Sequence, residues 1–404
     1  MMIKAAGAKC NLACKYCYYL EKSELRGERD AGAVLGDALL EKFVREHIAA
    51  NPWGASFTWH GGEPLLAPPG FYAKAVKLQK KYANGVPVEN CVQTNGTLLT
   101  DEWCRFFADN GWLVGISIDG PEDIHDRYRR SPGKSGSFRR VMRGLELLRK
   151  HNVRWNAMSA VTGYCAERFE SFYDFFRGAG CSFLQFTPVV ERFLDGGSGG
   201  LASLGDVGDP ADFSVSAKAW GGFLCGVFDM WAARDDGRVF IQTFESTLAN
   251  WLGLNPGVCS LSDSCGRTGV LSTNGDIYPC DHFVFEGRGI GNLYDASLGA
   301  LMRAPKQLEF ERIKTGLLPR KCRGCEFYFA CKGECPRNRF AKTETGEPYL
   351  NCLCGGYLEF FRHVKPHMDY MKSEFLNGRP VTSVMDVAFA GPQKTDRGKN
   401  HEHI

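Results

Sequence analysis

Three cysteines near the N-terminus have the spacing needed to hold a small metal cluster. Cys10, Cys14 and Cys17 form a C-x3-C-x2-C motif, so one loop can supply three thiolates. Three protein ligands on a four-iron cluster leave one iron open, and that iron can bind a substrate or a cofactor. A structural zinc site usually has four ligands, so zinc is the weaker interpretation of this motif.

A denser set of cysteines lies in the last third of the chain and could complete two further four-ligand sites. Ligation by protein alone suits electron transfer rather than substrate binding. Two zinc sites would have the same ligand number and type, whereas disulfides are disfavoured in a reducing compartment. Cys352 is the alternative to Cys354 in a set that contains Cys259, Cys265, Cys280, Cys322, Cys325, Cys331, Cys335 and Cys354.

Polar motifs follow the ends of several predicted strands. Gly61-Gly62-Glu63-Pro64 offers backbone amides beside a carboxylate, which suits the ammonium and carboxylate groups of an amino acid. Ser117 and Asp119 offer a hydroxyl and a carboxylate, and Arg143 could hold a carboxylate through two hydrogen bonds. Each could also be an ordinary turn residue or a surface charge.

Short apolar runs alternate with amphipathic helical patterns through the first half of the sequence. Six such units in series predict an α/β fold, a partial (β/α)6 TIM barrel whose functional loops lie at the carboxyl ends of the strands. The predicted strands are residues 3–6, 56–60, 89–94, 113–118, 155–161 and 182–187, and the helices between them are 39–50, 71–82, 102–110, 138–151 and 168–177.

The pattern changes from about residue 213. Helical patterns over 215–233 and 244–252 lead into the Cys-rich region, where 270–272 and 277–278 flank Asn274-Gly275, a pair that favours a hairpin turn. We predict a loop at 196–210. The expected division is a barrel domain with a connecting helix at 1–235, a Cys-rich domain with a β-hairpin and helices at 236–370, and a polar, partly disordered tail at 371–404.

Composition limits the classes of partner. Hydrophobic residues make up 44% of the 404 residues and charged residues 24%, as in ordinary globular proteins. A net charge of +3 is too small to predict nucleic-acid binding. The first residues lack the apolar run of a signal peptide, and no stretch of about 18 apolar residues predicts a membrane span. We therefore expect a cytoplasmic protein that binds neither nucleic acid nor membrane.

With these residues in view, the chain resembles the radical S-adenosylmethionine (SAM) enzymes, in which an aromatic residue such as Tyr16 precedes the last cysteine of the triad. Its C-terminal cysteines resemble the SPASM extension of peptide-modifying members. Over about residues 3–370 the chain is similar to the anaerobic sulfatase-maturating enzymes, although His60 stands where some members have Gln. The resemblance is carried by Cys10-Asn-Leu-Ala-Cys-Lys-Tyr-Cys-Tyr-Tyr, Gly61-Gly-Glu-Pro, Gln93-Thr-Asn-Gly-Thr, Ser117-Ile-Asp-Gly-Pro, Phe183-Leu-Gln-Phe and Tyr278-Pro-Cys-Asp.

This resemblance implies three [4Fe–4S] clusters and SAM as cofactors. Cys10, Cys14 and Cys17 would hold the first cluster. One auxiliary cluster would take Cys259, Cys265, Cys280 and Cys335, and the other would take Cys322, Cys325, Cys331 and Cys354. The residues implied to contact SAM are Gly61, Gly62, Glu63, Ser117, Asp119 and Arg143.

The implied reaction converts the Cys or Ser of a sulfatase C/S-x-P-x-R signature to Cα-formylglycine. A 5′-deoxyadenosyl radical would take a hydrogen from the β-carbon, a base would take a proton, and an electron would leave toward an auxiliary cluster. Asp281 matches the family's base, and Tyr19 and Gln93 would line the substrate site. The partners would be an unfolded or nascent sulfatase and, as electron donor, ferredoxin or flavodoxin.

Two other functions compete with this one. The first is a SPASM maturase that forms thioether or carbon–carbon links in ribosomal peptides, many of which carry an N-terminal peptide-binding domain. Here the triad begins at Cys10 and leaves no room for one. The second is a zinc-stapled binding protein without catalysis, which would be colourless and free of iron.

Overall fold

A parallel sheet forms the centre of the computed structural model, which describes residues 1–19, 34–193, 209–235, 237–285 and 287–387. The first six strands pair in sequence order, each parallel to the next. Their positions confirm the predicted strands: β1 (Met2–Lys4), β2 (Ala55–His60), β3 (Val88–Thr94), β4 (Leu113–Ser117), β5 (Arg154–Val161) and β6 (Phe183–Pro188).

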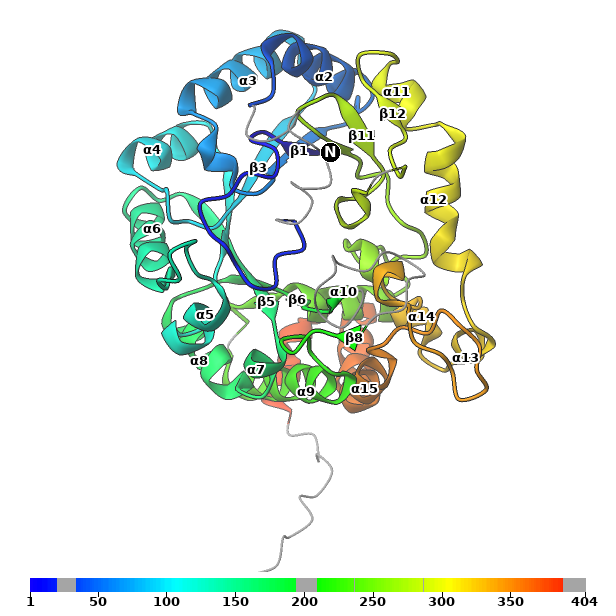
Figure 1. Cartoon of the computed structure of the whole chain (residues 1–404). Helices are drawn as coiled ribbons and strands as arrows, with labels where there is room; N and C mark the ends of the chain where they lie inside the picture. The colour runs from blue at the N-terminus through cyan, green and yellow to red at the C-terminus, as the bar shows by residue number, and fades with distance from the viewer. Residues whose placement is uncertain (20–33, 194–208, 236, 286, 388–404) are drawn as a thin grey trace, which may run out of the picture.

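Helices cover the outer side of this curved sheet (Figure 1). The predicted helices are all present, and the sequence analysis missed the short α5 (Glu122–Tyr128) and α7 (Gly163–Ala166). The predicted set is α2 (Asp37–Ala49), α3 (Pro69–Tyr82), α4 (Asp101–Asp109), α6 (Phe138–Lys150) and α8 (Phe169–Gly178).

Alternation along the strands separates the packed face from the barrel interior. On β2, Phe57 and Trp59 are fully buried, and the Trp59 ring lies 5.3 Å from the ring of Tyr72 on α3. Because side chains alternate between the two faces of a strand, Thr58 and His60 face the interior. The outer face therefore forms the core, and the inner face remains available for chemistry.

The Cys-rich region continues the same sheet from both sides. β9 (Phe240–Ile241) pairs parallel with β6, and β10 (Val270–Leu271) pairs parallel with β1. The predicted hairpin is confirmed: β10 pairs antiparallel with β11 (Asp276–Tyr278), which pairs with β12 (Gly291–Asn292). Gly275 has φ +91°, a conformation that favours glycine in the turn. The sheet thus has ten strands in the described chain.

Helices of the second half close the ring of Figure 1. α9 (Ala217–Arg234) packs along α15 (Cys354–Leu376), and α10 (Gln242–Trp251) lies against both α15 and β6. The remaining helices of this half carry or flank the cysteines: α11 (Leu298–Leu301), α12 (Pro305–Gly316), α13 (Arg320–Arg323) and α14 (Tyr328–Cys331).

The C-terminal segment differs from the predicted tail at its start. α15 continues to Leu376, and a 3-10 helix, η6 (Val381–Asp386), packs back onto it. This packing buries Met371 of α15 and Val384 of η6. Residues 388–404 of the predicted tail lie outside the described residues, as do 196–208 of the predicted loop. Asp209 and Pro210 form β8, which pairs with β7 (Arg192–Phe193). No helix in the described ranges is long and apolar enough to cross a membrane.

Candidate active site at the carboxyl ends of the barrel strands

The segment after β1, which carries the cysteine triad, lies inside the ring of strands (Figure 1). Hydrogen bonds hold its backbone to neighbouring loops on both sides. The Ala13 and Lys15 N–H groups donate to the carbonyls of Arg130 (2.7 Å) and Tyr128 (3.0 Å). On the other side, the N–H groups of Gly62 and Glu63 donate to carbonyls of residues 7 and 9 at 3.0 and 2.8 Å. The loop is therefore fixed between the β2 and β4 connections.

The three thiols of the triad lie close enough to influence one another. Burial raises the pKa of Cys14 to about 12; Arg129 opposes this rise, and Cys17 and Cys10 add to it. All three cysteines are free of disulfides. Three thiols on one loop are the number of ligands that a cluster with one open iron needs.

Glu63 faces its own chain rather than an open site. One carboxylate oxygen accepts from the Leu65 N–H (3.0 Å) and the Thr94 hydroxyl (2.6 Å), and the other accepts from the Asn95 N–H (2.8 Å). The side chain is fully buried, and burial raises its pKa to about 6. The carboxylate thus joins the β2 and β3 loops, which differs from the expected contact with an ammonium group.

Gly62 allows that junction because of its size. A Cβ atom there would lie 2.2 Å from the Lys9 carbonyl oxygen and 2.3 Å from that of Ala8. Gly61 is similarly close, with a Cβ position 2.8 Å from the Gly7 oxygen. Both glycines therefore serve the close approach of the cysteine loop to the end of β2.

Asp119 is buried and holds an arginine that the sequence analysis missed. Its carboxylate accepts from Arg129 Nε (2.9 Å), from the Tyr16 hydroxyl and from the Ala160 N–H (3.0 Å). The predicted Arg143 is instead exposed on α6, which lies on the outer side of the barrel. Arg129 follows α5 among several arginines, and only its burial beside Cys14 and Asp119 distinguishes it.

Gln93 and Ser117 meet in the barrel interior. Gln93 Nε2 donates to Ser117 Oγ at 3.0 Å. The Gln93 side chain crosses Gly115, where a Cβ would lie 2.1 Å from its oxygen, and approaches Asn156 on the next strand. The Asn156 side-chain oxygen is buried and has no hydrogen-bond partner in the described chain. A polar row thus crosses strands β3 to β5.

Asp281 lies where the cysteine loop meets the Cys-rich half. One carboxylate oxygen is 2.5 Å from Lys4 Nζ, and the other accepts from the Tyr18 hydroxyl at 2.5 Å. The Tyr19 ring is buried, with its face 4.2 Å from the same Lys4 ammonium. The structure therefore brings Asp281 and Tyr19 together through Lys4, a residue that the sequence analysis did not select.

The C-terminal thiols fall into two groups. Burial raises the pKa of Cys280 to about 12, and the neighbouring Asp281, Cys259 and Cys265 add to the rise. Burial also raises the pKa of Cys335, which Cys280 and Cys259 influence in turn. These four thiols that influence one another's pKa values, which we call the first group, are Cys259, Cys265, Cys280 and Cys335.

Cys322, Cys325, Cys331 and Cys354 influence one another's pKa values, and we call these four thiols the second group. Burial and then Glu334 raise the pKa of Cys331 to about 12, and Cys354 and Cys322 add to the rise; Cys354 is in turn influenced by Cys325. Burial and Glu334 also raise the pKa of Cys352 to about 12, but no other thiol of the described chain is among the main causes of that rise. Each group thus has the number of thiols that a fully ligated cluster needs.

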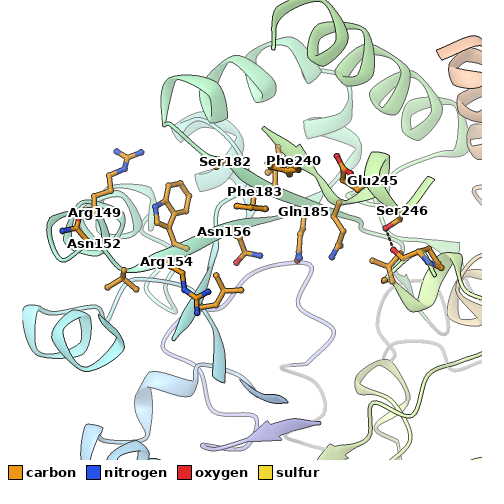
Figure 2. Close-up of a pocket in the computed structure, with 18 residues that line it drawn as sticks. Arg149, Asn152, Arg154, Asn156, Ser182, Phe183, Gln185, Phe240, Glu245 and Ser246 are labelled. Atoms are coloured by element: carbon orange, nitrogen blue, oxygen red, sulfur yellow. Dashed lines mark hydrogen bonds between the residues drawn. The ribbon is translucent and has the colours of Figure 1, made fainter. Parts of the chain in front are cut away.

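A separate cavity of about 990 Å³ opens at the amino ends of β4, β5 and β6. Figure 2 shows Asn156 and Gln185 pointing to the same side of the sheet, near the paired rings of Phe183 and Phe240. These rings stack with centroids 5.1 Å apart, and both are about half exposed. The cavity is also lined by Val258, the residue before Cys259.

Family models match both halves of the chain. The radical SAM superfamily model matches residues 6–176, and the SPASM iron-sulfur cluster-binding domain matches residues 265–326. The solved structure of native anSMEcpe with bound AdoMet superimposes with a TM-score of 0.81 at 31% identity, covering 92% of this chain and 98% of that one.

Curated relatives cover almost the whole chain. A serine-type anaerobic sulfatase-maturating enzyme of Bacteroides thetaiotaomicron is 51% identical over 98% of this chain and 96% of its own length. A serine-type enzyme of Klebsiella aerogenes is 36% identical, covering 90% and 84%, and a cysteine-type enzyme of Clostridium perfringens is 31% identical, covering 91% and 96%. With its partial barrel and three groups of thiols, this chain belongs to the anaerobic sulfatase-maturating enzymes of the radical SAM superfamily.

Proposed function

We propose that this enzyme oxidises the serine, rather than the cysteine, of a sulfatase signature to Cα-formylglycine. The observation that carries the choice of serine is the 51% identity to a serine-type enzyme over 98% of the chain, against 31% to a cysteine-type enzyme. The substrate would be the S-x-P-x-R segment of an unfolded or nascent sulfatase.

Cys10, Cys14 and Cys17 would hold the cluster that binds SAM. When bound, this pair supplies the radical chemistry that removes a hydrogen atom from the substrate's β-carbon. Gly61, Gly62 and Ser117 would lie against SAM. Glu63 and Asp119 would act indirectly, because their carboxylates are occupied by the chain's own donors. The exposed position of Arg143 does not support a contact with SAM, and buried Arg129 is the better candidate.

The two C-terminal groups would hold auxiliary [4Fe–4S] clusters that accept the electron released by the substrate. The first would use Cys259, Cys265, Cys280 and Cys335. The second would use Cys322, Cys325, Cys331 and Cys354. We place the boundary between the barrel and this Cys-rich domain near residue 235, at the end of α9.

Asp281 would be the base that takes the proton of the substrate's hydroxyl. Its carboxylate lies at the barrel mouth, directly after the cluster ligand Cys280 and beside Tyr18 in the cysteine loop. A base must reach the proton that it removes, and this position puts a carboxylate between the two cluster regions. Tyr19 and Gln93, both on the inner side of the site, would contact the substrate.

The cavity at the amino ends of β4 to β6 lies at the opposite end of these strands from the cysteine loop, and it would bind a segment of the substrate's polypeptide away from the reacting residue. The unpartnered Asn156 oxygen could accept a peptide N–H there, and the Phe183–Phe240 pair offers an exposed apolar surface. The electron donor would be a ferredoxin or flavodoxin. Seventeen cysteines fit the reducing cytoplasm, where clusters can form and thiols stay reduced.

The test compares two peptides that differ only in having Ser or Cys in the x-P-x-R signature. Anaerobically reconstituted enzyme receives SAM and a strong reductant, and mass spectrometry follows peptide aldehyde while chromatography follows 5′-deoxyadenosine. Ser-peptide aldehyde formed in step with 5′-deoxyadenosine, and faster than with Cys, is the expected result. Preference for the Cys peptide would overturn the serine assignment, and no aldehyde from either would favour a different peptide modification.

A further inference from the structure

We propose that Lys4 and Tyr18 position Asp281, each holding one oxygen of its carboxylate toward the substrate. This inference rests on the proposed role of Asp281 as the base. Lys4 Nζ is 2.5 Å from one oxygen, and the Tyr18 hydroxyl donates to the other at 2.5 Å. A buried ammonium paired with one oxygen and a hydroxyl that donates to the other therefore restrict the rotation of a carboxylate that comes from the other half of the chain.

The surroundings of Lys4 hold its ammonium in one place. It lies 3.1 Å from His60 Nδ1 at the end of β2 and 4.2 Å from the centre of the Tyr19 ring. The same His60 nitrogen accepts from the Gly61 N–H at 2.8 Å, so the imidazole is itself oriented. A carboxylate, an imidazole and an aromatic face thus surround the charge.

Tyr18 is held on its other side as well. The Arg337 guanidinium lies 4.7 Å from the centre of its ring and pairs with Glu191. The His282 ring meets the Tyr18 ring edge-on at 5.2 Å. The hydroxyl that reaches Asp281 is therefore fixed by residues of the Cys-rich half, while the residue itself follows cluster ligand Cys17.

Burial makes a purely structural role a poor explanation of Lys4. The side chain is fully buried on a strand whose neighbours are apolar, and Asp281 is 10% exposed. Replacing a buried ion pair by apolar residues is often neutral or stabilising, because both charges must be removed from water. The stability of the fold therefore does not explain a lysine at this position. A role in orienting the carboxylate of Asp281 does explain it.

The test measures how far aldehyde formation depends on Lys4 with and without the base. Lys4→Gln keeps a polar group but removes the charge, and we expect it to lower the turnover to aldehyde about 10- to 100-fold. Peptide KM, iron content and 5′-deoxyadenosine formation should stay within about twofold. Lys4→Arg keeps the positive charge, so its turnover to aldehyde should be about tenfold higher than that of Lys4→Gln. The control is Lys74→Gln, because Lys74 pairs with Asp37 at the same 2.5 Å but at the exposed surface.

A double-mutant cycle separates positioning from a general effect on the fold. In the Asp281→Asn background, Lys4→Gln should change residual aldehyde formation by less than about twofold. An equal loss in both backgrounds, or full turnover in Lys4→Gln, would overturn the inference. If Asp281→Asn alone keeps full turnover, the proposed base is wrong and the inference falls with it. Should Lys4→Gln fail to load iron, Tyr18→Phe decides: reduced aldehyde per 5′-deoxyadenosine supports positioning, and an unchanged ratio overturns it.

Discussion

Arg129 Nε donates to the carboxylate of Asp119 at 2.9 Å, and both side chains are almost completely buried. The same carboxylate accepts from the Tyr16 hydroxyl, and the Arg129 guanidinium lies over the Tyr16 ring. The Asp119–Arg129 ion pair therefore connects the end of β4 to the cysteine loop through Tyr16. Because the charge of Arg129 also acts on Cys14, the ion pair influences the cysteine triad.

Removing Arg129 should leave a buried, unpaired carboxylate. We expect Arg129→Met to lower the free energy of unfolding by about 3–5 kcal/mol, the usual loss when one partner of a buried ion pair is removed. Thermal unfolding under anaerobic conditions measures this. Arg143→Met on the exposed face of α6 is the control and should change stability by less than about 0.5 kcal/mol. Equal stability of the two variants would contradict a structural role for the Asp119–Arg129 pair.

A buried neutral histidine next to this pair predicts a pH dependence. His125 Nδ1 accepts from the Asp119 N–H at 3.3 Å, its Nε2 lies 2.9 Å from Ser137 Oγ, and burial lowers its pKa from 6.5 to about 4. Between pH 4 and pH 6.5, His125 is protonated in the unfolded chain but neutral in the folded chain. Stability from this group is therefore complete above about pH 6.5 and falls by up to about 3 kcal/mol as the pH drops toward 4.

The variant His125→Asn isolates that contribution. Asparagine keeps an acceptor for the Asp119 N–H but does not titrate, so its stability should vary less between pH 7 and pH 5 than that of the wild type. Anaerobic thermal unfolding at the two pH values gives the comparison. If the gap between wild type and variant is the same at both values, the histidine is not neutral in the folded state.

Strand positions could be predicted from the sequence because the barrel imposes a local pattern. Phe57 and Trp59 alternate with Thr58 and His60, and this period of two marks a strand whichever sheet it joins. The hairpin could be predicted for a similar reason, since Asn274-Gly275 determines its own turn. The pairing of Val270 with Met2 could not, because it depends on contacts between segments more than 250 residues apart.

The polar site shows where residue type stops being informative. The sequence predicts that Glu63 and Asp119 face a ligand, yet both carboxylates accept hydrogen bonds from donors of their own chain. Nothing in the sequence separates Arg129 from Arg143, since burial arises only when α5 returns to the cysteine loop. Lys4 did carry a signal, because a single charge within the apolar run 3–6 predicts a buried partner.

Gly62 gives a sharp test of the close approach between the β2 loop and the cysteine loop. In Gly62→Ala the new methyl group would meet two backbone oxygens at 2.2 and 2.3 Å, so the loops must separate. We expect loss of iron from the N-terminal site and of 5′-deoxyadenosine formation by at least about tenfold. Gly70→Ala on α3 is the matched control, because no atom lies within 4 Å of its Cβ position. Normal iron content in Gly62→Ala would show that this approach is not required.

Asn156 tests whether the cavity of Figure 2 holds the substrate's polypeptide. Asn156→Ala removes one buried hydrogen-bond acceptor. If a peptide N–H binds to that acceptor, losing the hydrogen bond should raise the peptide KM about 3- to 10-fold. 5′-Deoxyadenosine formation without peptide should not change. Asn377→Ala, at the exposed end of α15, is the control. An unchanged KM in Asn156→Ala would place the polypeptide elsewhere.

The last cluster ligand can be decided by a pair of neighbouring cysteines. Cys354 shares its surroundings with Cys322, Cys325 and Cys331, whereas burial and Glu334 dominate the environment of Cys352. We therefore expect Cys354→Ala to lose about one third of the iron, one of three [4Fe–4S] clusters, as measured by iron and sulfide analysis. Cys352→Ala should keep all of it, because a buried thiol without metal acts as a small apolar side chain. The reverse pattern would assign the ligand to Cys352, and a full iron content in both variants would mean that the fourth ligand is neither of them.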